Sequence, residues 1–97
     1  METRAIYGGA EIRPQTLRPF ANDWAQPTPD EVREVLRRAG LSGSATAKLL
    51  GIQSGRTIRR WTSDHDQVPI PYAAWAILCY QAGLGVIWEA KGVDVAG

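Results

Sequence analysis

Basic side chains that suit contacts with DNA are concentrated in the middle of the sequence. Between residues 33 and 60 there are seven Lys or Arg residues and one acid, Glu34, whereas the acids outnumber the bases after Trp61. Arginine can bind phosphate or donate two hydrogen bonds to guanine, and glutamine can pair with adenine. On charge alone, a solvated helix face is an equal alternative. The candidate DNA-binding residues are Lys48, Gln53, Ser54, Arg56, Thr57, Arg59 and Arg60.

Two short helices around a turn would position these side chains. Residues 42–61 begin with serines that suit a helix cap, and Gly51 breaks the first helix at a point where positive φ is tolerated. Either Ser54 or Gly55 opens the second helix. Ile58 and Trp61 lie three positions apart, so they share one face and are expected in the core. The basic residues of the second helix then fall elsewhere on its surface.

A helix is also predicted before this pair, over residues 28–39. Thr28 suits the N-cap, Pro29 the first helical position and Glu31 the reciprocal partner of a capping box. An apolar stripe follows, and Gly40 is the expected stop. Three arginines on this helix are as well explained by surface charge as by contact with flanking DNA backbone: Arg33, Arg37 and Arg38.

The stretch from Ile70 to Tyr80 is the most apolar part of the chain, and we expect a central core helix there. It could instead bury one face in the domain and another in a second subunit. Cys79 within it is expected to be a buried hydrophobe rather than a reactive thiol. The candidates for a dimer interface are Trp75, Ile77, Tyr80, Val86, Ile87 and Trp88.

The ends of the chain lack periodic patterns. Residues 1–27 are expected to form an irregular arm with at most one short strand, because they carry three prolines and a Gly-Gly pair. Phe20 and Trp24 should anchor this arm, either to the domain or to a second subunit. Residues 28–88 form the predicted domain, and residues 89–97 a frayed tail.

Length and composition exclude several classes of protein. The 97 residues suit one small domain, and the 11 basic and 10 acidic residues give a net charge of +1. One Cys and one His cannot make a disulfide or a Cys/His zinc site within one chain, so no metal or cofactor is expected. No membrane span, signal peptide or catalytic constellation is visible, which predicts a cytoplasmic protein that is not an enzyme.

Residues 28–64 resemble the Cro/repressor (Xre-like) class of helix-turn-helix regulators. The stretch TPDEVREVLRRAGLS is similar to the first helix of that class, ATAKLLGI to its positioning helix and GRTIRRW to its recognition helix. The later run IPYAAWAILCYQAGLGVIWE resembles the C-terminal half of small plasmid repressors of the KorC type. The resemblance implies an all-α fold, namely a four- to five-helix bundle of the lambda-repressor-like helix-turn-helix type.

The turn departs from the pattern of that class. The distance from Gly51 to Ile58 is one residue longer than usual, so the turn holds an extra residue between positions 52 and 55. Either the recognition helix starts later or Thr57 turns inward. The longer turn is preferred, because Ile58 and Trp61 then share the core face.

Together these features predict a sequence-specific transcriptional repressor that binds double-stranded DNA as a homodimer. A domain this small covers few base pairs, and a two-fold dimer on an inverted-repeat operator would lengthen the site. The alternative is a protein-interaction module, such as an antitoxin that binds a partner protein and its own promoter. A partner-binding arm should be disordered alone, whereas an arm that supports a repressor dimer should be ordered with Phe20 and Trp24 buried.

Overall fold

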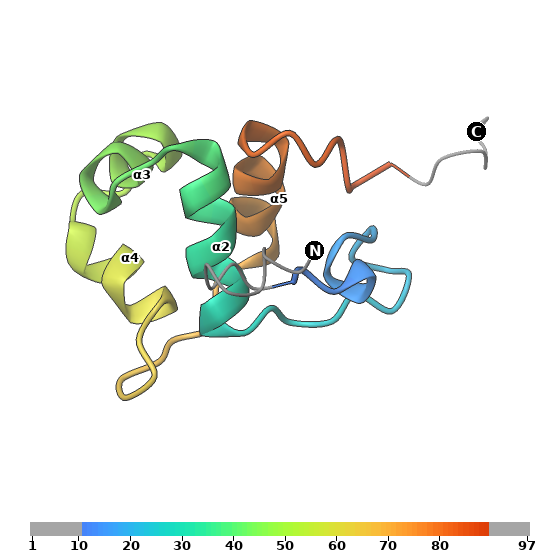
Figure 1. Cartoon of the computed structure of the whole chain (residues 1–97), viewed down its shortest axis with the longest axis horizontal. Helices are drawn as coiled ribbons and strands as arrows, with labels where there is room; N and C mark the ends of the chain where they lie inside the picture. Colours follow the sequence, from blue (N-terminus) through green and yellow to red (C-terminus); the bar gives the residue numbers. More distant parts are fainter. Residues whose placement is uncertain (1–10, 90–97) are drawn as a thin grey trace, which may run out of the picture.

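The computed structural model describes residues 11–89, which form four α-helices and one turn of 3-10 helix and contain no β-strand. In chain order the elements are η1 (Pro14–Thr16), α2 (Pro29–Ala39), α3 (Gly43–Leu50), α4 (Gly55–Trp61) and α5 (Tyr72–Gln81). Helix α2 packs against α5, and α3 packs against α4. Figure 1 shows α3 and α4 on one side of α2 and the η1 segment on the other. The all-α prediction is confirmed for these residues.

Helix α2 begins and ends where the sequence predicts. The Thr28 hydroxyl accepts a hydrogen bond from the Glu31 backbone N–H at 3.2 Å, and the Glu31 carboxylate accepts one from the Thr28 N–H at 2.8 Å. This reciprocal pair satisfies two backbone donors that the helix itself leaves without partners. Gly40 ends the helix in the left-handed region at φ +69°.

Local signals also define the two short helices. Ser42 caps α3 by accepting from the Ala45 N–H at 3.1 Å, and Gly51 ends it at φ +73°. The turn then runs from Ile52 to Ser54, which is the N-cap of α4. The Ile52 N–H donates a hydrogen bond to the Ala47 carbonyl at 2.8 Å. Helix α4 therefore begins at Gly55, one of the two predicted starts, and Ile58 and Trp61 share its buried face as expected.

The core is formed mainly by the inner faces of α2, α4 and α5. The largest buried side chain is Trp75 of α5, which is fully enclosed. Ile58 and Trp61 of α4 are both buried, as their spacing predicts. The other fully enclosed apolar side chains of the helices and of the approach to α5 are Val32, Val35, Ile70, Leu78 and Cys79.

The segment from residue 11 to residue 27 packs on the helices rather than standing apart from them. Thr16 in η1 is fully buried, and its carbonyl oxygen accepts the indole N–H groups of Trp24 and Trp75. Phe20 and Trp24 form an aromatic cluster with Tyr72 of α5, with ring centroids 5.1–5.9 Å apart. The two aromatic residues of this segment are thus anchored on the same chain.

Parts of the predicted arm and tail lie outside the described residues. Residues 1–10 of the arm and residues 90–97 of the tail belong to this group, so the strand expected in the arm is tested only from residue 11 onward. Within the described part, no helix is long and apolar enough to cross a membrane.

Candidate nucleic-acid interface

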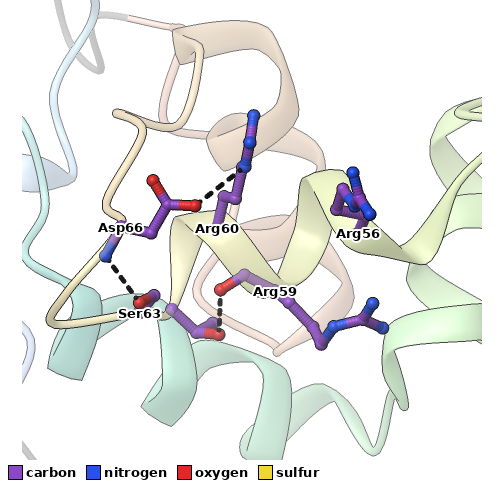
Figure 2. A pocket seen from close by; sticks show the side chains of 6 residues that line it. Arg56, Arg59, Arg60, Ser63 and Asp66 are labelled. Carbon is purple, nitrogen blue, oxygen red and sulfur yellow. Dashed lines mark hydrogen bonds and ion pairs between the residues drawn. The ribbon is translucent and has the colours of Figure 1, made fainter.

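Helix α4 separates an apolar face from a basic one. Ile58 and Trp61 point into the core, whereas Arg56, Arg59 and Arg60 are exposed. The three arginines line an open hollow together with Thr62, Ser63 and Asp66 from the loop that follows the helix. In Figure 2 the side chains of Arg59 and Arg60 extend in different directions from α4, and Arg56 lies nearer the start of the helix. An exposed row of guanidinium groups on a short helix is suited to bind an array of phosphates or base edges.

Ion pairing divides the basic residues of the middle region into two groups. Arg33 pairs with Asp30 and lies 3.6 Å from Asp64, and Arg60 lies 3.2 Å from Asp66. Arg37 and Arg38 both bind one carboxylate, that of Glu34. Within residues 11–89, no carboxylate pairs with the three remaining cations, which are Lys48, Arg56 and Arg59.

The neutral candidate residues lie in or near the turn between α3 and α4. Gln53 and Ser54 are exposed, and Thr57 is half-buried. The Ser54 hydroxyl oxygen accepts a hydrogen bond from the Arg56 backbone N–H at 3.1 Å, which fixes the first turn of α4. Ser54 therefore has a structural role in the cap, and its hydroxyl hydrogen is still available to a ligand. Gln53 is presented beside it, next to the start of α4.

Glu34 is a buried carboxylate on which sequence reasoning placed no role. It accepts from Arg37 Nε at 3.0 Å, from Arg37 Nη2 at 2.6 Å and from Arg38 Nε at 2.6 Å. The hydrogen bonds from Arg37 lower the pKa of Glu34 most, and the net result is a pKa of about 2 despite burial. Helical spacing of three and four residues could have indicated these contacts. They assign Arg37 and Arg38 an internal partner on α2.

Glu31, at the start of α2, is a second buried carboxylate. Arg13 donates to it from Nε and Nη2, each at 2.8 Å, and from its backbone N–H at 2.9 Å. Burial alone would raise the pKa of Glu31, but the hydrogen bonds from Arg13 and from the Thr28 backbone lower it to about 2. The capping role of Glu31 was predictable from its position after Thr28. The Arg13 partner, distant in sequence, gave no signal.

The candidate dimer residues fall into two groups. Ile77, Tyr80 and Trp88 are 40%, 57% and 48% exposed, and Val86 is half-buried. Trp75 and Ile87 are buried within the chain and offer almost no surface to a second subunit. These two side chains complete the core of the chain itself.

The single cysteine has no exposed chemistry. Cys79 is fully buried on α5, and burial raises the pKa of its thiol to about 12. Since the thiolate is the nucleophilic form, this side chain acts as a small apolar group. This agrees with the expectation from its apolar helix.

In the part of the chain that the structure describes, the protein is a small all-helical domain that exposes arginines on a short helix, α4. Over 82 residues the sequence is 57% identical to the transcriptional repressor protein KorC of Escherichia coli. The aligned residues make up 82% of this chain and 93% of that protein. A second Escherichia coli KorC is 53% identical over 83 residues, with 84% and 94% covered. The chain belongs to the family of KorC transcriptional repressor proteins. No protein-family model matches it, and no solved structure matches it significantly.

Proposed function

We propose that this protein is a sequence-specific, DNA-binding transcriptional repressor in the cytoplasm that acts as a homodimer on an inverted-repeat operator. The observation that carries the proposal is the exposed face of α4, where Arg56 and Arg59 have no carboxylate partner within residues 11–89. The family relationship supports it, because both relatives are transcriptional repressor proteins.

In this proposal α3 and α4 form a helix-turn-helix of the lambda-repressor-like type, and α4 is the recognition helix. Arg56 and Arg59 bind guanine or phosphate, and Gln53 binds adenine or the DNA backbone. Phosphate contacts come from the remaining candidates at the edges of α4 and from α3, which are Lys48, Ser54, Thr57 and Arg60. The packing of α3 against α4 supports this arrangement, because it places the turn and α3 beside the basic helix.

The dimer is proposed to form through the outer face of α5 and the segment after it. Helix α5 contains no charged residue, and Ile77 and Tyr80 are exposed on it. Trp88 adds a further exposed aromatic surface. Burying apolar side chains of this kind between two copies would stabilise a chain whose own core is small.

The N-terminal segment favours this function over the antitoxin alternative. An arm that folds only on a protein partner should make few contacts alone, but Arg13 is bonded to Glu31 of α2 and Thr16 to Trp75 of α5. Trp24 packs edge-on against the ring of Tyr72 of α5. The burial expected of both aromatic residues is met only in part, because Trp24 is half-buried and Phe20 is 65% exposed. The contacts of Arg13, Thr16 and Trp24 with α2 and α5 form within one chain and need no protein partner.

Selection from a pool of random duplex DNA at near-physiological salt tests the proposal. We expect enrichment of an inverted repeat whose half-sites lie about one helical turn apart. Recovery of a single half-site would contradict the dimer. Recovery of no motif by the folded protein would overturn sequence-specific binding and direct attention to a protein partner.

A further inference from the structure

We infer that Asp66 is a positioning residue that restrains Arg60 and thereby weakens sequence-independent binding to duplex DNA. The inference rests on the proposed DNA-binding function. Asp66 is an acidic residue that lines the same hollow as the three arginines of α4. The group that Arg60 would bind is a phosphate of the DNA backbone, and phosphate contacts carry no sequence information.

The loop after α4 places Asp66 beside Arg60. The Asp66 backbone N–H donates to the Ser63 hydroxyl at 2.9 Å, and the Val68 N–H donates to the Arg60 carbonyl at 3.1 Å. These bonds fold the loop back onto the end of α4. The Asp66 carboxylate then lies 3.2 Å from Arg60 Nε, as the dashed line in Figure 2 shows.

Among the three arginines that line the hollow, Arg60 differs from the other two because it is paired with Asp66. Arg56 and Arg59 line the same hollow, and no carboxylate among residues 11–89 pairs with either. Arg60 is the arginine next to the loop, and its charge is compensated locally. A phosphate that approaches this end of α4 must therefore compete with Asp66 for Arg60, and it also meets the negative charge of the carboxylate.

The expected size of the effect follows from the exposure of the pair. The side chains of Arg60 and Asp66 are 45% and 72% exposed, so solvent screens their attraction. Removing the carboxylate should raise affinity for an arbitrary duplex by about 1.5- to 5-fold per protomer, the range of exposed ion pairs. On a duplex of arbitrary sequence, the plot of log affinity against log salt should steepen by about one unit per protomer, because Arg60 then neutralises a phosphate without competition from Asp66.

The test compares Asp66→Asn with Asp64→Asn. Both substitutions remove one negative charge from the same loop, but Asp64 lies beside Arg33 at 3.6 Å rather than beside Arg60. Binding to a fluorescent duplex of arbitrary sequence is measured by anisotropy over a series of salt concentrations. We expect D66N to raise the affinity and the salt slope clearly more than D64N. Equal effects would mean that only net charge matters and would overturn the inference.

Two further variants separate the pairing from loop structure. In an Arg60→Gln background, the addition of D66N should raise affinity no more than D64N does. Asp66→Glu should restore binding close to that of the natural protein. An undiminished D66N effect without Arg60 would overturn the inference while leaving DNA binding intact. Failure of the natural protein to bind any duplex, even at low salt, would overturn the proposed function as well.

Discussion

Trp24 and Trp75 donate their indole N–H groups to the same acceptor, the carbonyl oxygen of Thr16, at 2.8 and 2.7 Å. Trp75 is the largest buried side chain of α5, and Trp24 belongs to the segment before α2. The shared acceptor joins the N-terminal segment to the centre of the core. This segment is therefore part of the same folded domain as α4.

The shared acceptor predicts that the two tryptophans are coupled in stability. Trp24→Phe should cost about 1 kcal/mol and Trp75→Phe about 2–3 kcal/mol of unfolding free energy, because the second also leaves a buried space. Each single variant leaves Thr16 with one donor, whereas the double variant leaves a buried carbonyl without any. Urea unfolding of all four proteins should show a double-variant loss that exceeds the sum by about 0.5 kcal/mol or more. Additive losses would contradict the shared-acceptor account.

Deletion of the N-terminal segment should unfold the protein. Removing residues 1–27 eliminates the bonds of Arg13 to Glu31 and of Thr16 to Trp75, and exposes the core beneath them. Removing only residues 1–10 retains all of these contacts. Circular dichroism melting should therefore give a cooperative transition for the shorter deletion and none for the longer one. A cooperative transition of unchanged midpoint after deletion of residues 1–27 would show that this segment is dispensable.

Acid should weaken the fold through two buried carboxylates. The pKa values of Glu31 and Glu34 are lowered from 4.5 to about 2, so folding favours their charged forms. This stability is present above pH 4.5 and is lost as the pH falls toward 2. Glu34→Gln should cost about 1–3 kcal/mol at pH 7 and much less near pH 2. Denaturation at several pH values checks this, and a loss in E34Q that is independent of pH would contradict it.

A charge on the outer face of α5 should dissociate the proposed dimer without unfolding the chain. Tyr80 is 57% exposed, so Tyr80→Glu can be solvated in the monomer but not in an apolar interface. Gln67→Glu places the same charge on an exposed loop and serves as the control. Sedimentation should give a monomer for Y80E and a dimer for Q67E. A Y80E protein that sediments as the dimer would remove α5 from the interface.

The helix boundaries were predictable because local chemistry determines them. Thr28, Ser42 and Gly51 act on backbone groups only a few residues away, so their effects can be inferred without knowledge of the fold. The spacing of Ile58 and Trp61 likewise identified the buried face of α4, and with it the exposed arginines.

The remaining features depend on contacts between distant residues. Arg13 reaches Glu31 from 18 positions away, and Thr16 reaches Trp75 from 59 positions away. No periodic pattern marks such pairs, and the segment before α2 therefore resembled a loose arm. Likewise, the sequence identifies Arg60 as a cation, but it does not indicate that the following loop folds back and places Asp66 beside it.

The central claim is that the arginines of α4 bind DNA, and the most direct measurement is the operator affinity of Arg56→Ala and Arg59→Ala. The control is Arg18→Ala, which removes an exposed arginine from the N-terminal segment. On the duplex selected from the random pool, each α4 variant should lose about 1–3 kcal/mol of binding free energy for every guanine contact, and R18A should lose little. Operator binding by both α4 variants with the affinity of the natural protein would contradict the account.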